Sequence, residues 1–117
     1  MEGKMRILLV ENDRELRAFF GSKLKDEFKG TIDLASTGKE AIKLLKTQIP
    51  YDVIVSDLVL PNGTGIDLLH FKIKNEINGS FIFFCTVKGG VPYPQDKYQQ
   101  VDKFSFGLLC EEIRKIQ

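Results

Sequence analysis

One short apolar run, followed at once by an acidic residue and a turn, constrains the fold of this chain most. The run extends from Val53 to Ser56, is rich in β-branched residues, and is followed directly by Asp57. A turn that contains Pro61 and Gly65 comes next. A continuous apolar run of this length, closed by turn residues, predicts a strand buried on both faces. Such strands occur mainly in parallel sheets that helices cover on both sides.

Strand-like and helix-like segments alternate along the rest of the chain, giving five strands and four helices. The predicted strands are 6–10, 31–35, 53–56, 81–85 and 99–102. Three helices are predicted at 13–28, between Thr37 and Pro50, and from Thr64 or Asp67 to about Asn78. The fourth is capped by Ser105, and its apolar side carries Leu108, Leu109, Ile113 and Ile116. Alternation of this kind predicts parallel strands joined by right-handed crossovers, so the expected fold class is α/β.

Size and composition exclude several classes of protein. A chain of 117 residues is the size of one domain, so we expect residues 1–117 to form a single domain. A net charge of +1 gives no case for direct binding to nucleic acid or to a membrane surface. Cys85 and Cys110 have no CxxC spacing and lie in apolar segments. We therefore expect buried, reduced thiols and a cytoplasmic protein.

Acidic residues also follow the first predicted strand. Glu11 and Asp13 stand on either side of Asn12, and Asp13 is placed to cap the next helix. If the first and third strands are neighbours, Glu11 and Asp57 emerge side by side at one sheet edge. Two close carboxylates repel each other, and a proton, a cation or a metal usually relieves the repulsion. Oxygen ligands on loops suit Mg²⁺.

Two further polar residues follow the last two strands. Thr86 comes after the fourth strand and Lys103 after the fifth. Taken singly, each has an ordinary explanation, as a strand-end residue or a solvated charge. At one edge with two carboxylates, however, a hydroxyl and an ammonium predict a pocket for a phosphoryl group.

These residues make the whole chain resemble the receiver domain of two-component response regulators, in the CheY-like superfamily. Residues 7–13 resemble the first strand and acidic pair of that family. Residues 57–61, followed by Gly65, resemble its phosphoacceptor motif. Thr86 matches the switch hydroxyl of the family, and Lys103 matches its phosphate-binding lysine.

The resemblance implies a flavodoxin-like, doubly wound sheet of order 2-1-3-4-5. It implies that Asp57 accepts a phosphoryl group from the phosphohistidine of a histidine kinase or phosphotransfer protein, and that the resulting change of conformation signals to a downstream protein target. Such a domain is a phosphoacceptor, at most able to phosphorylate and dephosphorylate itself, and not an enzyme acting on other molecules. The implied Mg²⁺ ligands are Glu11, Asn12, Asp57 and the backbone carbonyl of Val59.

One departure from the family pattern concerns the metal. Asn12 stands where the family usually has a second acid, so an oxygen ligand is kept but a full charge is lost. From the strength of close charge interactions, we expect a loss on the order of 1–3 kcal/mol, or roughly ten- to hundredfold in Mg²⁺ affinity. We therefore expect Mg²⁺ to bind, but weakly.

Other departures affect the switch and the output surface. Val87 follows the switch hydroxyl in place of a small residue, and we expect it to narrow access to Asp57. Gln100 stands where the family often has an aromatic residue, with Tyr98 two positions early, and Phe104 replaces a proline. The segment between the last two strands is too short and too rich in Gly and Pro for a full fourth helix.

Three interpretations remain open. The first is a receiver that is phosphorylated on Asp57, and the second is a pseudo-receiver that keeps the fold as a binding module. The third is a Mg²⁺-dependent phosphohydrolase, against which Val59 breaks the DxD pattern of aspartyl phosphatases. His70 is expected to be an ordinary surface histidine.

Overall fold

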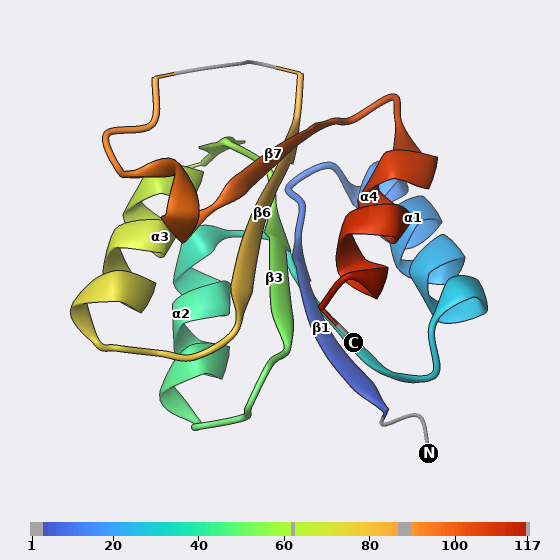
Figure 1. The fold of residues 1–117 in the computed structure, drawn as a ribbon, viewed down its shortest axis with the longest axis horizontal. Helices are drawn as coiled ribbons and strands as arrows, with labels where there is room; N and C mark the ends of the chain where they lie inside the picture. Colours follow the sequence, from blue (N-terminus) through green and yellow to red (C-terminus); the bar gives the residue numbers. More distant parts are fainter. Residues whose placement is uncertain (1–3, 62, 87–89, 117) are drawn as a thin grey trace.

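A five-stranded parallel sheet forms the centre of the molecule (Figure 1). The computed structural model describes residues 4–61, 63–86 and 90–116. The strands lie in the order β2-β1-β3-β6-β7, which is the order 2-1-3-4-5 when the strands of this sheet are counted along the chain. The predicted α/β fold is therefore confirmed. The strands are β1 Met5–Val10, β2 Gly30–Ala35, β3 Val53–Ser56, β6 Ser80–Cys85 and β7 Gln99–Asp102.

Helices cover both faces of the sheet, as burial of the strands on both sides requires. In Figure 1, α1 and α4 lie on one side of the sheet, and α2 and α3 lie on the other. The helices are α1 Arg14–Glu27, α2 Gly38–Lys46, α3 Gly65–Lys74 and α4 Phe106–Arg114. Strand residues alternate between two core clusters: Ile7 and Leu9 belong to the cluster under α1 and α4, whereas Leu8 and Val10 belong to the other.

Side-chain caps explain where three helices begin. Asp13 accepts a hydrogen bond from the backbone N–H of Leu16, and Thr37 accepts one from that of Glu40. At α3, Thr64 and Asp67 form a reciprocal capping box. At α2 the box is incomplete, because the Glu40 carboxylate accepts from the backbone N–H and hydroxyl of Ser36 instead.

The last helix differs from its prediction in two respects. The Ser105 side chain makes no capping hydrogen bond to α4. Leu108 is 53% exposed, whereas Cys110 is buried beside Leu109 and Ile113 in the core. The expectation that Leu108 faces the core is wrong because the buried side of α4 runs through Phe106, Leu109, Cys110 and Ile113, and Leu108 lies outside this arc of the helix. Cys85 and Cys110 are both buried, as predicted, and they do not form a disulfide.

A small hairpin that the sequence pattern did not predict follows Asp57. Strands β4 Val59–Leu60 and β5 Gly63–Thr64 pair antiparallel. Two residues per strand are too few for an alternating pattern to be recognised. The hairpin brings Gly65, the first residue of α3, back against the end of β3, where its backbone N–H donates to the carbonyl of Leu58 at 2.7 Å.

Within the described residues, the connection from β6 to β7 contains one 3₁₀ turn, η1 Gln95–Lys97, and no α-helix. The prediction of a short or missing fourth helix is therefore confirmed for this part of the chain. Val91, Tyr93 and Tyr98 pack against the core in its place, and Tyr98 contacts Phe83 edge to face. His70 is exposed, as predicted, and its ring contacts the hydroxyl of Tyr93. Val87 lies outside the described residues.

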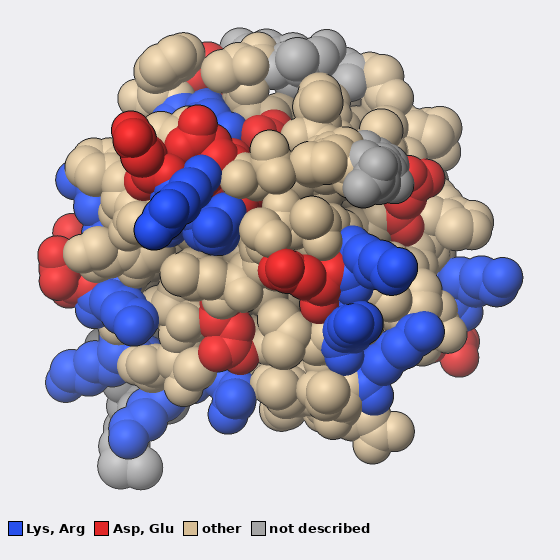
Figure 2. Space-filling model, turned by 180° about the vertical axis from the view of Figure 1, so that it is seen from behind, with Lys and Arg blue, Asp and Glu red and all other residues tan. Residues whose placement is uncertain are grey.

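The surface carries charges of both signs. Figure 2 shows Lys and Arg interspersed with Asp and Glu and with uncharged side chains over the face it presents. None of the described helices has the length and apolar character needed to cross a membrane.

Candidate functional site at the carboxyl edge of the sheet

Strand register brings the predicted site residues to one edge of the sheet. Val10 of β1 is the partner of Ser56 of β3, so the next residues, Glu11 and Asp57, leave the sheet side by side. The backbone N–H of Asp57 donates to the carbonyl of Val10 at 3.1 Å, and this extends the pairing by one residue. On the other side of β3, the backbone N–H of Lys103 donates to the carbonyl of Cys85 at 3.2 Å.

The Lys103 ammonium joins the two carboxylates. Its Nζ lies 2.6 Å from Oε1 of Glu11 and 2.7 Å from Oδ2 of Asp57. The three side chains are mostly buried, with 5% of Glu11, 13% of Lys103 and 19% of Asp57 exposed. Burial by itself would lower the pKa of Lys103. Hydrogen bonds to Asp57 and Glu11, together with their negative charges, outweigh burial and raise this pKa above its ordinary value.

The Asp57 carboxylate is oriented by the backbone that follows it. Its Oδ1 accepts from the N–H of Leu58 at 2.7 Å and from that of Val59 at 3.4 Å. Its Oδ2 is consequently the oxygen that faces Lys103. A Cβ on Gly65 would lie 2.3 Å from the carbonyl oxygen of Asp57, so only glycine allows α3 to begin this close.

The loop that carries Glu11 and Asn12 is held by a residue that the sequence analysis did not single out. The guanidinium of Arg17 donates to the carbonyl of Glu11 at 2.9 Å and to that of Asn12 at 3.1 Å. Oε2 of Glu11 accepts from the backbone N–H of Asp13 at 3.0 Å. Arg17 lies in the first turn of α1, and its position there was the only sequence signal that could have indicated this contact.

Asn12 is exposed at the rim of the site. Its Nδ2 donates to the carbonyl of Ser36 at 3.5 Å, a long contact. The same amide group carries an oxygen, Oδ1, that makes no hydrogen bond to any described residue. Val59 is also exposed, and 64% of its surface is open to solvent.

These donors are of the kind that Mg²⁺ prefers. Two carboxylates, one amide oxygen and a backbone carbonyl are hard oxygen ligands, and Mg²⁺ is commonly held by one or two carboxylates with several waters. The Lys103 ammonium lies within ion-pair distance of both carboxylates, so a cation at this site would compete with it for them. Among residues 4–61, 63–86 and 90–116, no group of three His, Cys, Asp or Glu side chains has metal-binding geometry.

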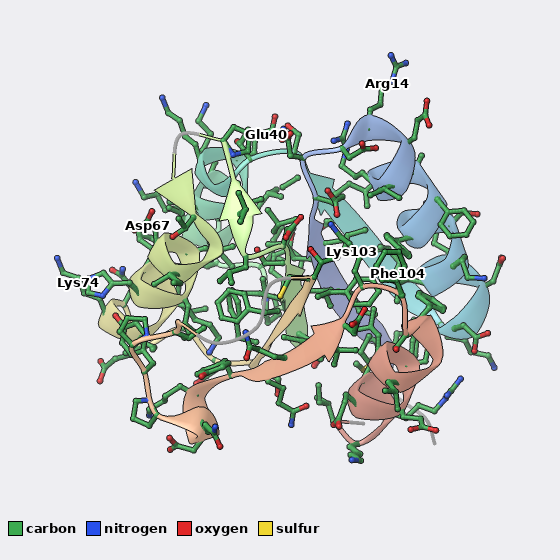
Figure 3. The ribbon with its side chains drawn as sticks, turned by 90° about the horizontal axis from the view of Figure 1, so that it is seen from above. Arg14, Glu40, Asp67, Lys74, Lys103 and Phe104 are labelled. Carbon is green, nitrogen blue, oxygen red and sulfur yellow. The ribbon has the colours of Figure 1, made fainter. Side chains whose placement is uncertain are left out.

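Thr86 directly follows β6 at the same edge and is exposed. No hydrogen bond in the described part of the chain joins its hydroxyl to Asp57 or Lys103. Figure 3, which looks down on this edge, shows Lys103 near the middle of the molecule, whereas Arg14, Asp67 and Lys74 lie at the periphery. Phe104 follows Lys103 and is 88% exposed.

Comparison with known proteins identifies relatives over most of the chain. A family model described as the response regulator receiver domain matches residues 7–103. Histidine kinase P4 of Formosa agariphila is 38% identical over 79 residues, which cover 68% of this chain. The chain spans only 6% of the length of that relative.

Solved structures agree with the fold. The receiver domain of the Francisella response regulator 1452 superposes with a TM-score of 0.81 and 26% identity, over 96% of this chain and 95% of that one. The response regulator protein TrrA of Thermotoga maritima, solved in complex with Mg²⁺ and BeF, gives a TM-score of 0.80 at 24% identity, over 97% of this chain and 99% of that one. TrrA has also been solved in complex with the histidine kinase ThkA.

Proposed function

Because this chain belongs to the response regulator receiver family, as the sequence resemblance predicted, we propose that it accepts a phosphoryl group on Asp57. One observation carries the proposal: the Lys103 ammonium contacts Asp57 and Glu11 together at the carboxyl edge of the sheet. A buried cation beside a carboxylate nucleophile is suited to a reaction that delivers more negative charge to that carboxylate. In this proposal residues 1–117 act as one receiver-like domain in the cytoplasm.

The transfer is a displacement at phosphorus. Oδ2 of Asp57 attacks the phosphorus of a phosphohistidine, and a new P–O bond forms. The P–N bond breaks, and its electron pair leaves with the imidazole nitrogen of the donor. The backbone N–H of Leu58 keeps the carboxylate plane fixed during the attack. Lys103 neutralises oxygens of the arriving phosphoryl group, and the product is an acyl phosphate.

Glu11, Asp57, the Asn12 amide oxygen and the Val59 carbonyl are the groups that would hold Mg²⁺. When bound, the ion offsets negative charge on the phosphoryl oxygens. Glu11 and Asp57 have to release part of their contact with Lys103 to serve as ligands. We propose that Asn12 and this competition together make the affinity for Mg²⁺ low.

The phosphoryl donor and the signal involve other proteins. The donor is the phosphohistidine of a histidine kinase or phosphotransfer protein, and the TrrA–ThkA complex supports this kind of partner. Thr86 is proposed to turn its hydroxyl toward the phosphoryl group and so transmit the change into β6. A downstream protein target then recognises the changed surface.

Intact-mass spectrometry tests the proposal. Incubation with acetyl phosphate and Mg²⁺ should add the mass of one phosphoryl group to the wild type, and hydroxylamine should remove it, because acyl phosphates react with this nucleophile. The Asp57→Asn variant should gain nothing. An unmodified wild type, under conditions that label a typical receiver domain, would contradict the proposal.

The same ion pairs support a second candidate, a pseudo-receiver that binds partners without phosphorylation. Lys103 already pairs with both Glu11 and Asp57, and the Asn12 amide points its Nδ2 toward Ser36. In that case neither acetyl phosphate nor beryllofluoride with Mg²⁺ changes the protein. The mass experiment therefore separates the two candidates.

A further inference from the structure

Arg17 of α1 reaches back over the loop that joins β1 to α1. Side chains of a helix lean toward its N-terminus, and Arg17 lies four residues after the capping residue Asp13. Its Nη1 donates to the carbonyl of Glu11 at 2.9 Å and to that of Asn12 at 3.1 Å. Because Nη1 carries two protons, it can serve both carbonyls at once. One side chain thereby fixes two consecutive peptide groups.

These peptide groups carry two of the proposed Mg²⁺ ligands, Glu11 and Asn12. The Glu11 side chain has further anchors, since its carboxylate contacts Lys103 and accepts from the backbone N–H of Asp13. The Asn12 side chain is exposed, and its one hydrogen bond to the described part of the chain is the long contact with Ser36. The position of Asn12 therefore depends mostly on the backbone that Arg17 holds.

The neighbouring loop, between β2 and α2, is held in a similar way. The backbone N–H and the hydroxyl of Ser36 donate to the carboxylate of Glu40 at 2.8 and 2.9 Å. The carbonyl of the same Ser36 accepts from Nδ2 of Asn12 at 3.5 Å. This contact occupies the nitrogen of the Asn12 amide, so the amide oxygen is the atom left for a cation.

The charge of Arg17 opposes a metal at this place, because a guanidinium beside a loop that binds a cation repels that cation. Glu40 lies close enough to offset part of this repulsion. Hydrogen bonds from Ser36 are the main cause that lowers the pKa of the Glu40 carboxyl, and the positive charge of Arg17 lowers it further. Since the charge of Arg17 is unfavourable, any gain in Mg²⁺ affinity from this residue has to come from the position of the ligands.

We propose that Arg17 is a positioning residue for the Mg²⁺ site, which holds the backbone of Glu11 and Asn12 in the arrangement that a cation needs. The proposal rests on the proposed function, because it takes its ligands from there. Arg17 donates to backbone carbonyls and not to the ligand side chains, so its effect on the metal is indirect. Asn12 supplies no negative charge to attract the ion, so the position of its oxygen matters more in this chain.

Backbone NMR shifts of the whole chain, followed against Mg²⁺ concentration, test the proposal. Arg17→Met should bind Mg²⁺ roughly tenfold more weakly than the wild type, as is typical when an outer partner of a metal ligand is lost. If Arg17 acted through its charge alone, the same variant would bind Mg²⁺ more tightly, so the two explanations predict opposite signs. Arg17→Lys keeps an ammonium that can donate to the carbonyls, and its affinity should lie between those of Arg17→Met and the wild type. Urea unfolding checks that each variant is folded.

Arg14 supplies the matched control. It lies three residues before Arg17 on α1, is exposed, and points away from the molecule in Figure 3. Arg14→Met removes the same charge and should bind Mg²⁺ as tightly as the wild type or more tightly. Three outcomes would overturn the proposal: unchanged or tighter binding in Arg17→Met, equal losses in both variants, or no binding of Mg²⁺ by the wild type.

Acetyl phosphate labelling of the wild type, measured separately, keeps the role of Arg17 distinct from that of Asp57. A labelled wild type together with unchanged Mg²⁺ affinity in Arg17→Met overturns the role of Arg17 alone. An unlabelled wild type whose Mg²⁺ affinity still falls in Arg17→Met overturns phosphorylation of Asp57 and supports the role of Arg17.

Discussion

Gly65 and Asp57 are in direct backbone contact: a Cβ built on Gly65 would lie 2.3 Å from the carbonyl oxygen of Asp57 and 2.8 Å from the ring of Phe83. The start of α3 is thereby fixed against the residue that we propose as phosphoacceptor. The backbone of Asp57 cannot move aside as the end of a flexible side chain can. The effect of a larger residue at position 65 can therefore be predicted.

Gly65→Ala should destabilise the protein by about 1–3 kcal/mol, since the added methyl group forces the backbone near Asp57 to shift. The free energy of unfolding in urea measures the loss. Gly107→Ala is the matched control, because Gly107 lies in α4 with no atom near the added Cβ. That variant should be neutral or up to about 1 kcal/mol more stable, as alanine favours helix. Equal effects of the two substitutions would contradict the contact.

Lys103→Met should lower stability by about 1–3 kcal/mol, because it leaves two mostly buried carboxylates facing each other. Asp57→Asn should cost less than about 1 kcal/mol, since Lys103 keeps its pair with Glu11. Thermal melts in EDTA measure both. A larger effect of Asp57→Asn than of Lys103→Met would show that the ammonium does not stabilise both carboxylates.

Added Mg²⁺ should stabilise Lys103→Met more than the wild type. A cation that binds only to the folded state stabilises it. Removal of the Lys103 ammonium leaves the carboxylates of Glu11 and Asp57 available to Mg²⁺. The midpoint of thermal unfolding against Mg²⁺ concentration gives the comparison. Identical Mg²⁺ dependence in the two proteins would indicate that Mg²⁺ does not bind between Glu11 and Asp57.

Asn12→Asp should tighten Mg²⁺ binding by roughly ten- to hundredfold, since it restores one full charge beside Glu11. Isothermal titration of Mg²⁺ measures the affinity. Asn78→Asp, in the exposed loop after α3, adds the same charge at the other end of the sheet and should leave the affinity unchanged. Equal gains in both variants would mean that the effect is one of net charge and not of a ligand at position 12.

Tyr51 should make stability fall at alkaline pH. Burial raises the pKa of its phenol, and the hydrogen bond that it donates to Asp33 at 2.5 Å, with the charge of Asp33, raises it further. The folded state therefore keeps a proton that the unfolded state loses above about pH 10. Stability from this group is complete below that pH and is lost as pH rises toward the folded-state value.

Tyr51→Phe should cost about 1 kcal/mol at neutral pH, because one hydrogen bond is lost. Above about pH 10 its stability should fall less steeply than that of the wild type, by up to about 1.4 kcal/mol per pH unit. Urea unfolding at several pH values measures the slopes, and phenolate absorbance reports the titration directly. If the stability of both proteins falls with pH at the same slope, the raised pKa of Tyr51 is contradicted.

The parts of the fold that the sequence predicted are those in which burial follows a regular period. β3 was recognisable because Val53 to Ser56 are buried on both faces, and α1 because Asp13 caps a 3.6-residue pattern. The proximity of Glu11 to Asp57 followed from parallel pairing together with the strand order that the family resemblance implied. In each case local chemistry and tertiary packing favour the same structure.

The parts that were missed depend on tertiary contacts with no periodic signal. The β4–β5 hairpin has two residues per strand, and Arg17 reaches backbone carbonyls, which any sequence provides. In α4, Leu108 and Cys110 are both apolar, and only the packing of the helix on the sheet determines which is buried. The Asn12 amide likewise makes a tertiary contact without a periodic signal, because its Nδ2 lies 3.5 Å from the Ser36 carbonyl that follows β2.

Lys103 has a single positive charge and divides it between two acids. A phosphoryl dianion on Asp57 would draw that charge to itself, and Glu11 would lose its counter-ion while the other oxygen of its carboxylate still accepts the N–H of Asp13. Asp13 is the residue that caps α1. The first turn of α1, together with Thr86 on the far side of β3, should therefore be the first part of the structure to change when Asp57 is phosphorylated. A spectroscopic probe placed there would report that change.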